Sequence, residues 1–329
     1  MESTPAPAPA GGGRELAAGV VVLSTAVALI SVGVGALLVI AAVTGHAAGP
    51  WVSPEALSPG LLGAAMAGTA PALLTVGRAG TWEEVRSLVW PLVVVLVGLF
   101  TVSLVNGGEL RIATGGPIFL VLFSLGWVAT LGLLAAGAVV CVALQYRRPA
   151  GPRTDAGAGV AAGAGTGAGP GAGAGPRAGV GAAAGVGAVG RTAPLPGWAK
   201  PLLALLGAGW FGVGAGLLAA PDFWGPLVPW EVSRADAQGL GVWALALGVG
   251  VLGALAEDDL ARIRPALLAV PVVSLAVAVL LAVHASAVDW SSGPALCLVG
   301  LVTGLLATGV SGRLLWARHR SAAAAADAS

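Results

Sequence analysis

Two short loops of this chain carry the residues best suited to binding a solute. Each loop begins with a Pro-Trp pair and continues with a carboxylate. Because the pattern occurs twice, it suggests an outward-facing cleft with tryptophan walls and acids at its mouth. The alternative is the belt of tryptophans that membrane proteins place at the water interface. Two polar residues, His284 and Asp289, follow a later apolar segment and complete the candidate site. It consists of Trp51, Glu55, Trp230, Glu231, His284 and Asp289.

Other motifs predict neither a cofactor nor a metal site. Residues 185–190 have the GxGxxG spacing of a dinucleotide site, but no strand precedes them, no helix follows, and no acid lies about twenty residues further on. Glycine is so frequent in this tract that the pattern arises by chance. The three histidines, His46, His284 and His319, are too scattered in the sequence to indicate a metal centre.

Acids precede arginines in two further loops. Glu83 and Glu84 come just before Arg86, and the acids at 257–259 come before Arg262. This spacing suits ion pairs three or four residues apart on a short interfacial helix, each worth a few tenths of a kcal/mol. Docking of a protein partner on these loops is the functional alternative.

Long apolar segments must position all of these loops. The chain is 57 % hydrophobic and 9 % charged, with a mean hydropathy of +0.92, which places it among membrane proteins rather than soluble domains. Its charges lie at segment ends and form no basic face, so no nucleic-acid partner is predicted. The segment at 58–76 is short and interrupted by Pro71, and whether it crosses fully stays open. Eight segments approach or exceed the roughly 17–25 residues that span a bilayer: about 16–44, 58–76, 88–105, 117–144, 201–219, 239–256, 265–283 and 295–312.

The eight predicted spans contain no Asp, Glu, Lys, Arg, His, Asn or Gln. Coupled carriers and ion pathways keep such groups at bilayer depth, so their absence disfavours an ion-coupled pump and an enzyme acting inside the membrane. Only Ser and Thr are available as polar groups there. The GxxxG pairs Gly212/Gly216 and Gly300/Gly304 predict close helix contacts.

The positive charges predict an orientation. Of the 16 Lys and Arg residues, only Arg111 and Arg234 fall on the outer side when the N-terminus is cytosolic. Cytosolic loops are enriched in Lys and Arg. We therefore expect a multi-pass plasma-membrane protein with both termini in the cytosol.

The two halves of the sequence resemble each other. Gly33–Ala36 recurs as Gly212–Ala215, and Pro50-Trp51 recurs as Pro229-Trp230 at the same spacing. The predicted fold class is an all-α integral membrane helical bundle of about eight helices, in two parallel four-helix repeats related by a pseudo-two-fold axis along the membrane normal. The predicted domains are a disordered cytosolic tail (1–15), the first repeat (16–146), a disordered Gly/Ala-rich cytosolic linker (147–199), the second repeat (200–316) and a cytosolic tail (317–329).

Residues 200–315 combine several aromatic, acidic and basic features: Phe223-Trp224, Pro229-Trp230-Glu231, Gly239, Trp243, the acids 257–259 and Arg262-Ile263-Arg264-Pro265. This stretch resembles the small multi-pass membrane proteins of actinobacteria that have no assigned activity. The first half follows the pattern more loosely. The resemblance implies a helical membrane fold and no particular chemistry.

These observations favour a non-catalytic membrane component with an accessory, structural or sensing role. The alternative is a facilitative permease for a small, weakly polar solute. A permease predicts a cavity lined by Ser, Thr and Gly between the two repeats, whereas a scaffold predicts close packing there. The expected partners are the lipid bilayer and a protein at the cytosolic loops.

Overall fold

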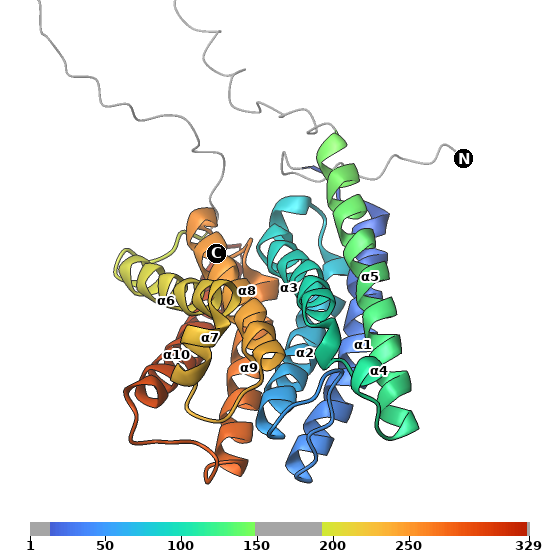
Figure 1. Cartoon of the computed structure of the whole chain (residues 1–329). Coiled ribbons are helices and arrows are strands. Elements are labelled where there is room, and N and C mark those ends of the chain that lie inside the picture. The colour runs from blue at the N-terminus through green and yellow to red at the C-terminus, as the bar shows by residue number, and fades with distance from the viewer. Residues whose placement is uncertain (1–13, 149–192, 328–329) are drawn as a thin grey trace, which may run out of the picture.

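The computed structural model describes residues 14–148 and 193–327, and these residues fold almost entirely into helices (Figure 1). Within them no β-strand forms, and extended pairing is limited to the isolated bridges Glu15–Thr81 and Trp51–Leu110. The fold is an all-α bundle. Most of the predicted N-terminal tail and of the predicted linker lies outside the described residues.

Eight helices in the described part are long and apolar enough to cross a membrane, and each coincides with one predicted span. An apolar helix satisfies its own backbone hydrogen bonds, which is the requirement that lipid places on a spanning segment. They are α1 (Ala18–Val43), α2 (Leu57–Leu74), α3 (Arg86–Val105), α5 (Ile118–Arg147), α6 (Ala199–Ala219), α8 (Arg234–Glu257), α9 (Arg264–Val283) and α10 (Gly293–Asp327).

Short elements join these helices: η1 (Val76–Arg78), η2 (Trp82–Glu84), η3 (Gly107–Glu109), α4 (Arg111–Thr114), α7 (Pro221–Trp224) and η4 (Gly225–Leu227). Because the long helices alternate in direction, α1, α3, α6 and α9 all begin at one end of the bundle. This end is called the basic end, since Arg14, Arg86, Lys200 and Arg262 lie there. The opposite end, where α2 and α8 begin, is called the distal end.

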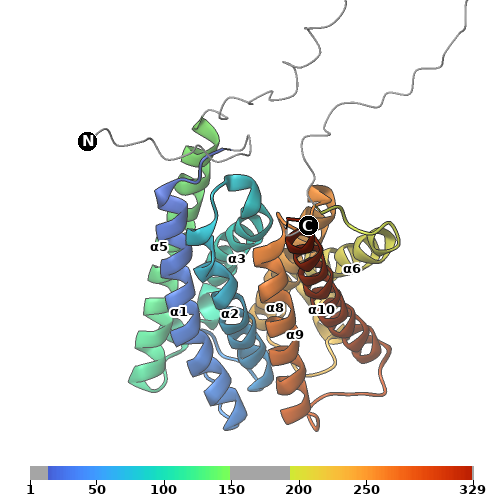
Figure 2. The same cartoon turned by 180° about the vertical axis from the view of Figure 1, so that it is seen from behind.

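The two halves of the chain lie side by side, α1–α5 in one half and α6–α10 in the other (Figures 1 and 2). Within each half the first helix packs on the second and the third on the fourth, α1 on α2 and α3 on α5, then α6 on α8 and α9 on α10. Between the halves, α2 packs on α9 and α3 packs on α8. The second long helix of each half thus packs on the third long helix of the other half, which is the pairing expected of two copies around a two-fold axis.

Glycines allow the first two helices of each half to approach closely. A Cβ added at Gly35 would lie 2.7 Å from the Gly63 carbonyl oxygen on α2, and one added at Gly214 would lie 2.2 Å from the Leu245 nitrogen on α8. Gly35 and Gly214 occupy matching positions in the two halves. The GxxxG prediction is wrong in part, because Gly212 and Gly300 have open space at their Cβ positions.

The segment that was weakest in the sequence, α2, is the most buried long helix. Within its most apolar window 67 % of the residues are buried, against 28 % for α5. It lies between α1 of its own half and α9 and α8 of the other. Small residues suit a helix with neighbours on several sides, so its low hydropathy fits its central position.

Candidate functional site

The first predicted tryptophan, Trp51, links the two halves at the distal end. Its side chain is 2 % exposed, and its Nε1–H donates a hydrogen bond of 2.7 Å to Oδ1 of Asp236 on α8. Ser53 donates to the same oxygen at 2.8 Å. The indole also meets Trp127 of α5 edge to face, with ring centroids 6.2 Å apart. Trp51 is therefore an internal anchor, with little surface left for a cleft wall.

The second predicted tryptophan, Trp230, makes the reverse connection. It is 8 % exposed, and its Nε1–H donates a hydrogen bond of 2.9 Å to Oγ of Ser58 in the first turn of α2. Each loop tryptophan thus binds the first turn of the second helix in the opposite half. A buried indole is satisfied when its N–H finds an acceptor, as both do here.

Asp236 lies inside a helix that begins earlier than predicted. The predicted span started at residue 239, whereas α8 begins at Arg234 because Ser233 and Asp236 form a reciprocal capping box. Asp236 is 2 % exposed, and Gln238, also buried, follows it. At the far end of α5, Gln145 is buried as well, where it accepts from the Ala17 amide at 2.8 Å. The helices α5 and α8 therefore carry strongly polar groups near their ends, just outside the predicted spans.

A second set of polar contacts joins α8 to the end of α3 and the loop that follows it. The Asn106 side-chain amide donates to Oε1 of Gln238 at 2.6 Å, and Gln238 donates through Nε2 to the Leu218 carbonyl at 3.2 Å. Glu109 accepts from the Ala235 amide at 3.3 Å. A carboxylate near the start of a helix is stabilised by its free N–H groups and its dipole. No sequence motif indicated Asn106, Glu109 or Gln238, although the Ser-x-x-Asp pattern at 233–236 is a signal for the cap.

Three of the predicted polar residues gather at the distal end. Burial raises the pKa of the Glu55 carboxyl above its ordinary value of 4.5, the nearby Glu231 carboxylate raises it further, and His284 opposes them. Oε2 of Glu55 and Nε2 of His284 are both buried without a hydrogen-bond partner among the described residues. The cluster spans both halves, since Glu55 precedes α2 while Glu231 and His284 belong to the second half.

Asp289 serves its own loop. Its carboxylate accepts from the Ser291 amide at 3.1 Å and from the Ser291 hydroxyl at 2.6 Å. Its backbone amide donates 2.8 Å to the Pro229 carbonyl, which ties this loop to the one that carries Trp230. No hydrogen bond described here joins its side chain to Glu55 or His284.

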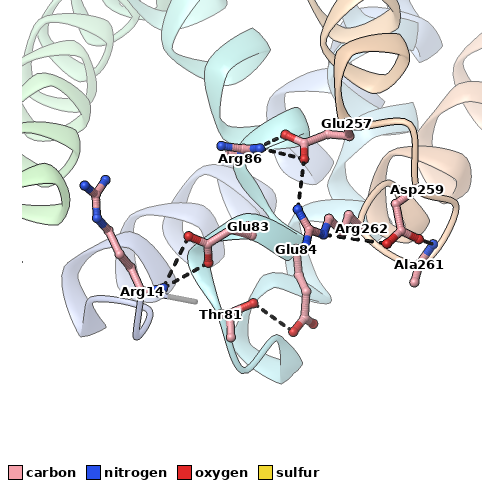
Figure 3. A network of polar contacts seen from close by, with 9 residues as sticks. All are labelled: Arg14, Thr81, Glu83, Glu84, Arg86, Glu257, Asp259, Ala261 and Arg262. Atoms are coloured by element: carbon pink, nitrogen blue, oxygen red, sulfur yellow. Dashed lines mark hydrogen bonds and ion pairs between the residues drawn. The ribbon is translucent and has the colours of Figure 1, made fainter. Parts of the chain in front are cut away.

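The basic end is held by an ion-pair network (Figure 3). Arg86, the first residue of α3, makes a two-pronged contact with Glu257, the last residue of α8, through Nε and through Nη2 at 2.7 Å. Arg262 approaches Glu257 at 3.8 Å and Asp259 at 3.6 Å. A bidentate arginine–carboxylate pair is stronger and more directional than an ordinary surface pair. Arg86 and Glu257 therefore connect the halves here as the tryptophans do distally.

The predicted pairing within the acid–arginine loops is correct for only one loop. Asp259 and Arg262 do pair three residues apart. In the first loop the acids face elsewhere, because Glu83 accepts from the Arg14 amide at 3.0 Å and Glu84 accepts from the Thr81 hydroxyl at 3.0 Å (Figure 3). Arg86 therefore pairs with Glu257 of the opposite half instead.

Between the two ends, the halves meet in direct contact. A Cβ at Gly68 of α2 would lie 2.8 Å from Cα of Val273 on α9, and one at Gly98 of α3 would lie 2.8 Å from Val242 on α8. The two cavities described for this structure are enclosed mainly within single halves. One, of about 260 Å³, lies among α1, α2, α3 and α5, and the other, of about 170 Å³, lies among α6, α8, α9 and α10. Neither Trp51 nor Trp230 lines them.

Comparison with known proteins does not add a function. No protein family, no curated protein and no solved structure matches the chain. The resemblance to actinobacterial membrane proteins stays a prediction.

Proposed function

We propose that this protein is a non-catalytic integral membrane component with an accessory or structural role. The observation that carries the proposal is the seam between the halves, which is joined at three levels. Trp51 and Trp230 cross it at the distal end, α2 and α9 are in contact at its middle through Gly68 and Val273, and Arg86 binds Glu257 at the basic end.

Such a seam is suited to holding one shape. A carrier that rocks one repeat against the other moves the halves as rigid bodies around a central site. Here that motion would break two buried indole hydrogen bonds and a bidentate ion pair, and separate close backbone contacts. The arrangement supports a frame that presents its end loops to a partner.

The proposed location is the plasma membrane, with the basic end in the cytosol. The eight spans bring both ends of the described chain to the same side. The excess of Lys and Arg at that side supports a cytosolic basic end. The exposed Arg147 and Arg148 then also face the cytosol.

One observation favours the permease as a second candidate. Three residues that carry hydroxyl groups, Ser31, Thr69 and Thr130, line the cavity of the first half. A small neutral solute would pass through this half alone rather than along the seam.

Flux through proteoliposomes separates the two functions. The purified protein is reconstituted, and shrinkage of the vesicles is followed by light scattering after mixing with glycerol, urea or acetamide. The component proposal expects re-swelling at the rate of protein-free vesicles. If re-swelling is faster and the cavity-filling substitution Ser31→Trp abolishes the increase, the protein is a permease and the proposal of a non-catalytic component is rejected. Faster re-swelling that survives Ser31→Trp would also reject the component, and would place the route elsewhere.

A further inference from the structure

The cavity of the first half has the properties of a binding site for a small ring compound. Its walls come from α1, α2, α3 and α5, and Trp243 of α8 closes it on the side of the other half. Its volume is about 260 Å³. A dry apolar cavity of about 150 Å³ is known to bind benzene, so this one has room for a larger molecule, although it is smaller than the roughly 300–1,000 Å³ of drug-sized pockets.

The chemistry of the wall selects a neutral ligand with an acceptor. No charged side chain lines the cavity, and most lining residues are aliphatic or aromatic. Nε1 of Trp243 is buried without a hydrogen-bond partner among the described residues. A buried donor left unpaired costs about 1–3 kcal/mol. A ligand oxygen that accepts from this N–H would recover that cost.

Comparison of the halves shows why the cavity exists. Ser31 on α1 matches Trp210 on α6 at the spacing that relates Gly33 to Gly212. Trp210 is buried and belongs to the core of the second half. There the remaining cavity is smaller and extends toward the start of α6, where Ala199 and Leu203 line it. A serine in place of an indole leaves the middle of the first half hollow.

The bilayer is the natural source of such a ligand. α1 and α5 form the outer wall of the cavity, and they bury only 33 % and 28 % of their most apolar windows. Neutral ring compounds concentrate in the hydrocarbon phase next to these two helices. We propose that the first-half cavity binds a neutral, mainly apolar molecule of one or two rings that carries a hydrogen-bond acceptor and arrives from the bilayer.

Photolabelling with benzophenone tests this proposal. Benzophenone has two rings and one carbonyl acceptor, and on irradiation it inserts into nearby C–H bonds. The full-length protein in lipid nanodiscs is irradiated and the labelled peptides are mapped by mass spectrometry. We expect labels to concentrate on cavity residues such as Met66 and Phe123. Labels spread evenly over the lipid-facing surfaces would overturn the proposal.

Competition and substitution make the test specific. Acetophenone should suppress labelling at about one tenth of the bilayer concentration of ethylbenzene, which has the same shape but no carbonyl, because one net hydrogen bond is worth roughly a factor of ten. Trp243→Phe should remove this preference while labelling persists. If the preference survives Trp243→Phe, the assigned donor is wrong and the proposal fails.

The filling variant Ser31→Trp should abolish labelling of the cavity residues. The matched control is Leu29→Trp, which adds an indole to an exposed position of the same helix and should leave labelling unchanged. Size-exclusion elution and thermal midpoint establish that each variant folds. If Ser31→Trp does not fold, Thr130→Phe fills the cavity from α5 and replaces it. Cavity labelling that persists in the folded filling variant would refute the site.

Discussion

Trp51 and Trp230 hold the two halves together by the same contact made in opposite directions. Trp51 of the first half donates to Asp236 at the start of α8, and Trp230 of the second half donates to Ser58 at the start of α2. The two tryptophans match in the sequence at an offset of 179 residues, and the exchange is what the proposed two-fold relation between the halves predicts. The acceptors differ, since one is a buried carboxylate and the other a hydroxyl.

Replacing Trp51 by Phe removes the donor and keeps most of the ring. Asp236 then loses one of its hydrogen bonds in a buried setting, and we expect a loss of about 1–3 kcal/mol of stability. The thermal midpoint in detergent measures the effect. The control is Trp198→Phe, at a residue that is 63 % exposed and should tolerate the change. Equal midpoints for the two variants would show that the Trp51–Asp236 bond contributes nothing.

The positions of the spans could be predicted from the sequence because lipid imposes length and apolarity on each segment separately. Contacts between segments could not. Nothing local to Arg86 indicates that it binds Glu257 rather than Glu83, because that choice depends on how α3 lies against α8. The sequence predicts a later start for α8 because its first turn is polar, and its partners include Trp51 and Glu109 on loops that are distant in sequence.

Glycine positions test the helix crossing in the second half. Gly214→Ala places a methyl group 2.2 Å from the Leu245 nitrogen, so α6 must move away from α8 at a cost of about 1–3 kcal/mol. Gly212→Ala, two residues away on the same helix, meets open space and should change stability by less than about 1 kcal/mol, in the stabilising direction. Thermal midpoints of the two variants are compared. A crossing elsewhere on α6 would reverse their order.

The Arg86–Glu257 pair should show measurable coupling. A double-mutant cycle with Arg86→Met and Glu257→Gln isolates the pairwise contribution. Because Arg86 is partly exposed, we expect about 1 kcal/mol rather than the value of a buried pair. The reference cycle uses Arg234→Met and Asp222→Asn, whose side chains are exposed and 3.7 Å apart, and should give less than about 0.5 kcal/mol. If the coupling free energy of the Arg86–Glu257 pair is no larger than that of the reference pair, this ion pair does not hold the two halves together at the basic end.

The raised pKa of Glu55 predicts a pH dependence of stability. The folded state holds a proton that the unfolded state releases near pH 4.5, so between the unfolded and folded pKa values the folded protein binds more protons. Stability contributed by this group is therefore present below pH 4.5 and is lost as the pH rises through the folded pKa. Glu55→Gln should remove this decline and exceed the parent protein in thermal midpoint at neutral pH.

The companion variant for this titration is Glu231→Gln. Removing the neighbouring carboxylate lowers the pKa of Glu55 toward its ordinary value without removing the burial that is the larger cause. The decline in midpoint with pH should become smaller and begin lower, yet remain detectable. Parallel midpoint curves for the parent protein and Glu55→Gln from pH 4 to pH 8 would mean that Glu55 keeps its ordinary pKa.

Cysteine labelling tests the proposed orientation. In a background with Cys141→Ala and Cys297→Ser, single cysteines replace Ser291 in the distal loop and Arg148 at the basic end, both exposed positions. A membrane-impermeant maleimide added to intact cells should label the residue 291 variant and not the residue 148 variant, because the proposed orientation puts the basic end in the cytosol. Permeabilised cells should label both, which controls for reactivity. Labelling of residue 148 in intact cells would invert the topology and move the Arg86–Glu257 network to the outside, where the excess of positive charge is not expected.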